Sequence, residues 1–324
     1  MLGCGTATFT EPDDYRTNVP GAAIDLVLTG SEPLRARVTW INLRRLNLVR
    51  LEESVPRIAA ISLAPALLFV SFPLSRHPQA IWNARPLQRG EMAFHSPGEH
   101  FHQRTCGVCR WGMASLTAGD FAAYSRALLG TRLASPAAMR ILQPSSRATA
   151  DFLRLHNQAC RLVQTKPAMA AHPEVARALE QGLIHALIRC GGEDSLRGHE
   201  SGGRQHAEII GRFEQLLATE HDRPLPLPEL CAALGVADRT LRTSCTQVLG
   251  MGPVKYARLR RLNLVRSTLL RADPRADNVG MVARKYGFTE LGRFAAAYRA
   301  AFGEMPSATL RRTGFVATDA ADFA

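Results

Sequence analysis

The chain has 324 residues, 46% of them hydrophobic, and a formal net charge of +12. This length predicts two or three compact units. No stretch approaches eighteen uncharged apolar residues, which argues against a membrane span. The first residues lack a basic segment followed by an apolar run, which argues against a signal peptide. Seven cysteines, an odd number, fit reduced thiols in a cytoplasmic protein.

Residues 1–140 are predicted to form a β-rich domain, either a barrel or a sandwich. Short apolar runs from Ala23 to about Gly119 are separated by proline, glycine and serine, which is typical of strands joined by turns. The runs are AIDLVLTG, ARVTWINLRRLNLVRLEE, AISLAPALLFVSFPL, EMAFHSPGEHFHQRT and VCRWGMASL.

Residues 141–190 are predicted to form a helical dimerisation segment. From Ser145 the apolar residues recur at helical spacing, and Pro173 opens a second helix with the same periodicity. The two apolar stripes comprise Phe152, Leu155, Ala159, Leu162 and Val163, and then Val175, Leu179, Leu183 and Leu187. The polar, glycine-rich segment 191–205 is interpreted as a flexible linker.

Positive charge is concentrated after that linker. Residues 204–312 contain 18 Lys and Arg against 10 Asp and Glu, which is +8 of the chain's net +12. Basic residues that neutralise phosphates supply most of the sequence-independent affinity for DNA. We therefore predict a DNA-binding domain over 206–312, followed by a tail at 313–324.

The predicted DNA-binding domain repeats one pattern twice. A short helix ends at Gly235, since glycine easily takes the left-handed backbone that terminates a helix. A second helix follows from about Asp238 to Leu249, and Pro253 opens a long connecting helix. The pattern then recurs, with Gly287 in the turn. A helix, a glycine-containing turn and a second helix are the arrangement that lays the second helix in the major groove.

The second copy of the pattern has its own helix signals. Val279, Val282 and Ala283 give the apolar face of its first helix. Phe288 is expected to pack into the core, and Thr289 is a good N-cap for the next helix. Gly303 ends that helix.

These residues resemble the AraC/XylS family of bacterial transcription factors. Residues 253–266 read PVKYARLRRLNLVR and residues 287–312 read GFTELGRFAAAYRAAFGEMPSATLRR; within the family, the second run is most similar to the ethanolamine-operon regulators. Three residues depart from the family's usual serine, phenylalanine and serine, namely Ala237, Cys245 and Gly252. Asp238 is an alternative cap, which would shift the start of its helix by one residue.

The resemblance implies a fold class and a function. The expected fold is α+β and multidomain, with a β-rich sensor domain and two helices before an all-α tandem helix-turn-helix domain. The expected protein is a cytoplasmic, ligand-responsive transcription regulator, an activator that binds double-stranded DNA as a homodimer and contacts RNA polymerase. The pocket for its small-molecule effector would lie inside the barrel, near side chains such as Trp82, His95 and Arg104.

The residues predicted to contact DNA lie at the start of each recognition helix and on the connecting helix. They are Arg239, Thr240, Arg242, Thr243, Lys255, Arg258, Thr289, Glu290, Leu291 and Arg293. Arg239 is assigned to direct readout, because arginine donates two hydrogen bonds to guanine, and the resemblance also puts a base-contacting residue there. Leu291 suits a thymine methyl and Glu290 a cytosine amino group. Three others suit phosphates: Lys255, Arg258 and Thr289.

A second reading of the front domain stays open. Five side chains have metal-ligand character: His95, His100, His102, Cys106 and Cys109. His-x-His on a strand points both imidazoles to one face, but Cys-x-x-Cys alone is an incomplete zinc set. The alternatives are a metal-responsive regulator, a thiol-based redox regulator, or a barrel enzyme fused to a DNA-binding module. No catalytic motif appears, so we predict no enzyme activity and no cofactor.

One repeat within the chain tests the influence of context. The octapeptide Leu-Arg-Arg-Leu-Asn-Leu-Val-Arg occurs at residues 43–50 and again at 259–266. We predict a strand for the first copy and a helix for the second, since surrounding structure overrides weak local propensities.

Overall fold

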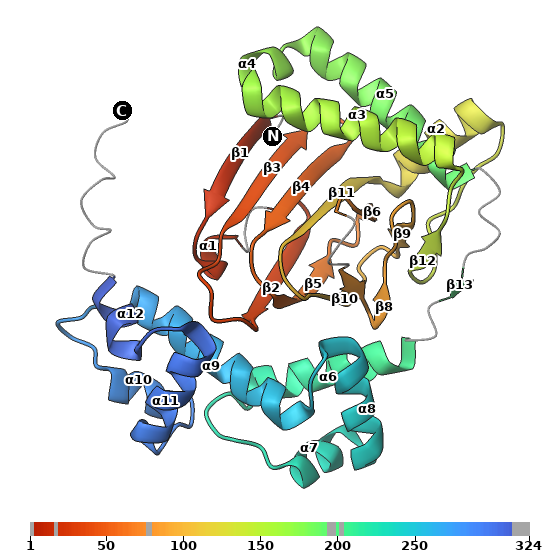
Figure 1. Ribbon diagram of the computed structural model, residues 1–324. Helices are drawn as coiled ribbons and strands as arrows, with labels where there is room; N and C mark the ends of the chain where they lie inside the picture. Colours follow the sequence, from red (N-terminus) through yellow and green to blue (C-terminus); the bar gives the residue numbers. More distant parts are fainter. Residues whose placement is uncertain (1–2, 16–18, 76–79, 193–198, 201–203, 313–324) are drawn as a thin grey trace. The chain divides into compact units, whose positions relative to one another are not determined.

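The computed structural model describes most of the chain (Figure 1). The described residues are 3–15, 19–75, 80–192, 199–200 and 204–312. The chain divides into two compact units. The first comprises Met1–Asp25, Leu34–Ser54 and Ala59–Arg204, and the second Leu26–Pro33, Val55–Ile58 and Gln205–Ala324. The predicted tail at 313–324 and most of the predicted linker, residues 193–198 and 201–203, lie outside the described residues.

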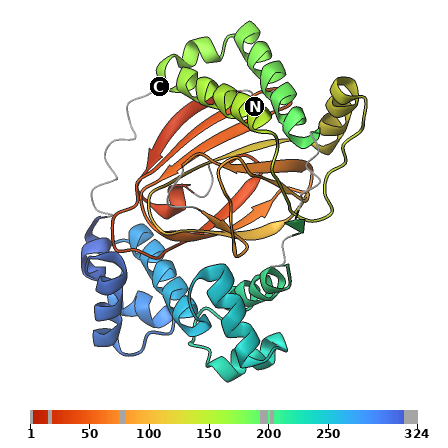
Figure 2. The ribbon, with the colours of Figure 1, turned by 45° about the vertical axis from the view of Figure 1, so that its right-hand side comes forward.

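Two β-sheets build the front of the chain, which confirms the predicted β-rich domain (Figure 2). The larger sheet has the strand order β1-β3-β4-β11-β6-β9-β12-β13 and the smaller β2-β5-β10-β7-β8. The strands are β1 (Gly3–Phe9), β2 (Ala22–Leu28), β3 (Ala36–Asn42), β4 (Asn47–Glu53), β5 (Arg57–Leu63), β6 (Leu67–Pro73), β7 (Ile81–Trp82), β8 (Arg85–Pro86), β9 (Met92–His95), β10 (His100–Thr105), β11 (Cys109–Thr117), β12 (Arg140–Leu142) and β13 (His199–Glu200). The pairs β1–β3, β3–β4, β4–β11 and β11–β6 run antiparallel.

Helices accompany the sheets in the first unit. They are α1 (Pro12–Tyr15), α2 (Ala118–Leu129), α3 (Ser146–Thr165), α4 (Pro167–Ala170) and α5 (Pro173–Gly192). The Ser145 hydroxyl caps α3 by accepting a hydrogen bond from the Ala148 amide at 3.2 Å, as expected of an N-cap. The sequence did not predict α2, because the strand-like pattern runs up to the Thr117 hydroxyl that caps it.

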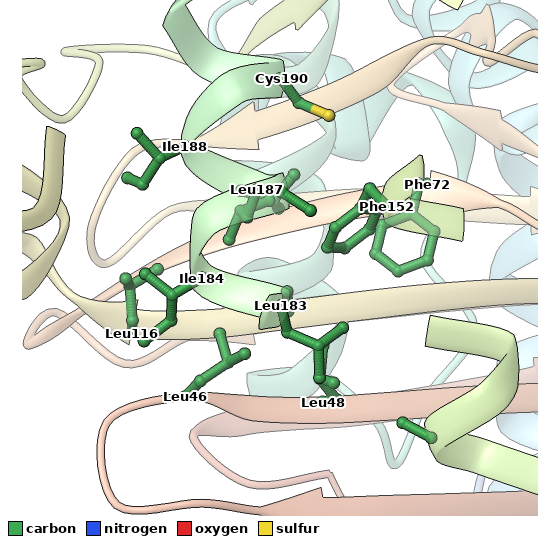
Figure 3. Close-up of a cluster of buried hydrophobic side chains, with 14 of the residues drawn as sticks. Leu46, Leu48, Phe72, Leu116, Phe152, Leu183, Ile184, Leu187, Ile188 and Cys190 are labelled. Carbon is green, nitrogen blue, oxygen red and sulfur yellow. The ribbon is translucent and has the colours of Figure 1, made fainter. Parts of the chain in front are cut away.

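The core of the first unit lies where α3 and α5 pack on the larger sheet (Figure 3). Leu183 of α5 lies beside Leu48 of β4, Leu187 of α5 belongs to the same buried cluster, and the Phe72 ring of β6 meets the Phe152 ring of α3 edge-on with centroids 5.0 Å apart. All five side chains are buried. Since each fully buried large apolar side chain contributes about 1.5–3 kcal/mol, this cluster holds both helices on the sheet.

The two copies of the octapeptide take different conformations. In the first, residues 43–46 form the turn between β3 and β4, and residues 47–50 open β4. In the second, all eight residues lie in α9 (Pro253–Arg271). The helix prediction is therefore confirmed, whereas the strand prediction is right only for the second half of its copy.

The second unit is mainly helical. Its helices are α6 (Arg204–Thr219), α7 (Leu227–Leu234), α8 (Asp238–Leu249), α9 (Pro253–Arg271), α10 (Val279–Lys285), α11 (Leu291–Phe302) and α12 (Pro306–Arg312). The order α6-α7-α8 is repeated by α9-α10-α11. Across the described residues of the chain, every helix is too short or too polar to cross a membrane.

Candidate nucleic-acid interface

The first helix-turn-helix consists of α7, a turn and α8. Gly235 takes a positive φ of 64°, and its amide and that of Val236 bond back to carbonyls of α7, a glycine-dependent helix stop. Leu241 is buried on the inner side of α8. The cap of α8 is Ala237, which makes no side-chain bond. Asp238 is not the alternative cap. It lies inside the first turn, where its carboxylate pairs with Arg242 and suits the positive end of the helix dipole.

The second helix-turn-helix consists of α10, a turn and α11. The Asn278 side chain caps α10 by accepting from the Met281 amide at 2.8 Å. Gly287 has a φ of 74°, and Phe288 is buried as predicted. Thr289 was wrongly predicted as the cap of α11, which is Glu290 without a side-chain bond. Thr289 therefore lies in the turn, one residue before the cap.

Helix α9 belongs to both helix-turn-helix units. Toward the first, Arg260 pairs with Glu214 of α6 at 2.9 Å, and the Tyr256 hydroxyl donates to the same carboxylate. Toward the second, Leu262 and Val265 of α9 pack in a core with residues of α10, α11 and α12. One continuous helix therefore connects the two helix-turn-helix units.

Most of the predicted DNA-contacting side chains are exposed on this domain. The exposed ones are Arg239, Arg242, Thr243, Lys255, Arg258, Thr289, Glu290 and Arg293. Thr240 and Leu291 are half-buried, and Leu291 packs against the core of the second helix-turn-helix. Part of the Leu291 side chain therefore packs in the protein, and only the remaining part is available to contact a DNA base.

The two recognition helices present different chemistry. Helix α8 displays two exposed arginines, of which Arg242 is paired with Asp238. Helix α11 displays Arg293, which is paired with Glu290 at 3.0 Å although its side chain is 80% exposed. Both ion pairs are exposed and therefore weak, so a phosphate or a base edge can take either arginine from its carboxylate.

Cys245, one of the family departures, packs on the inner side of α8. Burial raises the pKa of its thiol to about 12. Because the thiolate is the reactive form of cysteine, this side chain acts as a small apolar residue in place of the phenylalanine.

The five predicted metal-ligand residues in the first unit differ in burial: three are buried and two are exposed. His95 is buried, stacked on the Phe101 ring, and its Nε2 lies 3.0 Å from the Ser71 hydroxyl. The His100 and His102 ring centroids are 5.2 Å apart, but only His102 is buried. Cys106 is exposed and Cys109 is buried. Within the described residues, no three or more His, Cys, Asp or Glu side chains are grouped to hold a metal ion.

Sequence reasoning missed two arginines that hold the turns. Arg212 of α6 donates to the Leu234 carbonyl, and Arg261 of α9 donates to the Tyr286 carbonyl at 3.2 Å. Each acceptor precedes a turn glycine, Gly235 or Gly287. A basic residue in a helix within a basic domain gives no sign in the sequence that it faces inward.

Residues 230–312 match a family model described as a helix-turn-helix domain. Over 99 residues the chain is 36% identical to "XylDLEGF operon transcriptional activator 2" of Pseudomonas putida, covering 31% of this chain and 63% of that protein. This C-terminal region is an AraC-type DNA-binding domain. The AraC-type domain accounts for the two glycine turns, the shared α9 and the positive charge described above.

A longer match reaches beyond the AraC-type domain. The chain is 27% identical over 165 residues to "Probable thc operon regulatory protein" of Rhodococcus erythropolis, which covers 51% of this chain and 50% of that one. Among solved structures, a chain titled as a probable AraC family transcriptional regulator from Rhodopseudomonas palustris is 30% identical, with a TM-score of 0.30, over 33% of this chain and 97% of that one. The chain spans half to under two thirds of these two curated relatives.

Proposed function

We propose that this protein is a sequence-specific transcription regulator that lays α8 and α11 in adjacent major-groove segments of double-stranded DNA. The observation that carries the proposal is the repeated helix-turn-helix on one shared helix, with arginines exposed at the start of both recognition helices. Recognition helices of this class present their first turns to base edges. Lys255 and Arg258, exposed on α9, contact the phosphates between the two segments.

Arg239 is the residue proposed for direct base readout. It is exposed in the first turn of α8, whereas Arg242 one turn later is paired with Asp238. A bidentate arginine–guanine contact contributes about 1–3 kcal/mol of discrimination. At the second segment we assign Arg293, Glu290 and the exposed part of Leu291.

The first unit is proposed as the sensor of a small-molecule effector and the homodimer interface. Buried polar atoms support an interior site: within the described residues, Trp82 Nε1 and Arg104 Nε lack a hydrogen-bond partner. Buried donors of this kind are costly unless a partner satisfies them. An effector must bind two states of the regulator unequally to change DNA binding.

As an activator, the protein would act in the cytoplasm, as a homodimer, through contact with RNA polymerase. The names of the P. putida relatives support activation. The likeness of residues 287–312 to ethanolamine-operon regulators supports a subgroup, but it does not identify an effector. We propose no catalytic step.

The experiment that tests this function is a selection of sheared genomic DNA by the full-length protein. Wild type should enrich a motif with two parts, one for each recognition helix. Arg239→Ala should relax one position of one part and weaken binding to the motif by about 10-fold or more. Arg177→Ala is a matched control, because that exposed arginine lies on α5 and pairs only with Glu174 among the described ion pairs.

Two results would contradict the proposal. The first is binding without sequence preference in every condition, including one in which cell extract supplies small molecules. That result would contradict sequence-specific regulation. A motif with a single part would remove the tandem use of α8 and α11 while leaving DNA binding intact.

A further inference from the structure

The turns of the two helix-turn-helix units are held by the same device. Arg212 donates to the carbonyl of Leu234, and Arg261 donates to the carbonyl of Tyr286. In each case the acceptor immediately precedes the turn glycine. The last carbonyls of a helix have no partner within it, and a charged donor makes a stronger hydrogen bond than a neutral one.

The second turn is held at additional points. The Tyr286 hydroxyl lies 2.7 Å from the Thr268 hydroxyl, so α9 holds both the backbone and the side-chain end of this tyrosine. The Arg261 guanidinium also lies over the Phe288 ring, 5.0 Å from its centroid. The Arg261 side chain is half-buried, and this burial lowers the pKa of its guanidinium.

The second turn also rests on the first helix-turn-helix, through the segment that joins α6 to α7. The ring centroids of Tyr286 and His221 are 6.0 Å apart. A Cβ placed on Gly287 would lie 2.6 Å from the Asp222 carbonyl oxygen, whereas a Cβ on Gly235 would meet nothing within 4 Å. The two helix-turn-helix units, both within the second compact unit, therefore touch at the second turn. The Gly235 turn makes no corresponding contact.

We propose that Arg261 is a positioning residue that seats the second turn on the 221–223 segment and so fixes the spacing between the DNA segments read by α8 and α11. This inference rests on the proposed function. One base pair of extra spacing moves a half-site by about 3.4 Å and rotates it by about 34°. A rigid junction rejects that change, and a loosened one tolerates it.

The test measures affinity for duplexes in which the two motif parts are separated by the natural spacer or by one base pair more or fewer. Wild type should prefer the natural spacer by about 10-fold or more, a difference of about 1.4 kcal/mol. Arg261→Gln should reduce that preference to less than about 3-fold, and Arg261→Lys should retain part of it. An Arg261→Gln variant that loses affinity by the same factor at every spacer would overturn the proposal.

Three matched variants separate positioning from other effects. Arg212→Gln removes the same bond from the first turn and should relax base preference under α8 while leaving the spacer preference intact. Arg258→Gln removes an exposed arginine of α9 and should lower the salt dependence of binding by about 0.9 in log–log slope. Arg261→Gln should leave that slope unchanged; a loss of slope would make it a phosphate contact. Gly287→Ala should lose the spacer preference, whereas Gly235→Ala, equally strained at positive φ, should keep it.

A measurement without DNA separates failure of this inference from failure of the proposed function. In full-length Arg261→Gln, amide hydrogen exchange should accelerate at residues 286–290 and remain as in wild type at residues 235–237. Unchanged exchange at 286–290 would overturn the inference whatever the DNA results. Faster exchange in a protein that selects no two-part motif would instead sink the proposed function and leave the junction as a purely structural contact.

Discussion

The same eight residues build a turn and a strand in one region of the molecule and a helix in the other. In the first copy, alternate residues such as Leu46 and Leu48 are fully buried against α5. In the second, burial falls on Leu262 and Val265, three residues apart, while Leu264 is half-buried. Residues two apart share a face of a strand, and residues three or four apart share a face of a helix. The comparison teaches that the partner surface, rather than the octapeptide, selects the periodicity.

The largest expected effect is at Leu48 and its counterpart Leu264. Leu48→Ala should destabilise the first unit by about 3 kcal/mol, because it leaves a cavity in a closed core. Leu264→Ala should cost about 1 kcal/mol or less in the second unit. Urea unfolding followed by tryptophan fluorescence measures the first, since all three tryptophans lie in that unit. Hydrogen exchange across α9 measures the second, and equal costs at the two sites would contradict the comparison.

The first arginine of the octapeptide comes next. Arg260 bonds to Glu214 and to the Leu217 carbonyl, and its side chain is only 16% exposed. Its counterpart Arg44 is exposed. Arg260→Ala should cost about 1.5–3 kcal/mol by hydrogen exchange, since Glu214 loses its charged partner, whereas Arg44→Ala should stay within about 0.5 kcal/mol. If Arg260→Ala left the stability measured by hydrogen exchange unchanged, apolar packing alone would hold α9 in place.

The last residue of each copy is an arginine, Arg50 or Arg266, and only Arg50 lies near a buried histidine whose protonation makes stability depend on pH. His156 is fully buried beside the first copy. Its burial is the main cause that lowers its pKa to about 3, and the positive charge of Arg50 is the second cause. In the second copy the counterpart Arg266 faces Glu304 and the Phe302 ring instead.

The unfolded chain takes up a proton on His156 near pH 6.5 and the folded chain does not, so stability is lost as pH falls from about 6.5 toward 3. At pH 5 the loss should be about 2 kcal/mol relative to pH 7.5. His156→Phe should remove that part of the dependence in urea unfolding followed by tryptophan fluorescence. Parallel pH profiles for wild type and variant would show that the histidine accepts a proton in the folded state.

The smallest effect is expected at Arg45, the counterpart of Arg261. Arg45 makes an exposed ion pair with Asp120 at 3.2 Å, and such pairs contribute about 0–1 kcal/mol. Arg45→Gln should leave both DNA affinity and spacer preference unchanged in the assay described for Arg261. A change in either would mean that the turn between β3 and β4 influences the AraC-type domain.

The helix boundaries of the DNA-binding domain follow closely from its glycines and prolines. Gly235, Gly250 and Gly303 take positive φ values at helix ends, and few other residues accept that conformation. Thr289 was mispredicted because the capping preference of its side chain does not set the start of α11, whose cap, Glu290, makes no side-chain bond. Helix α2 escaped prediction because the apolar run of β11 continues directly into it.

By itself, the sequence determined the repeated helix-turn-helix, the β-rich character of the front domain, and the arginines displayed on α8 and α11. These features depend on local backbone preference and on apolar periodicity, both of which are written residue by residue. Only the tertiary structure decided that Arg261 faces the Tyr286 carbonyl while Arg258, one turn earlier, faces solvent. It also decided which half of the first octapeptide is strand. Both outcomes depend on which distant surface each side chain meets, and that information is absent from the local sequence.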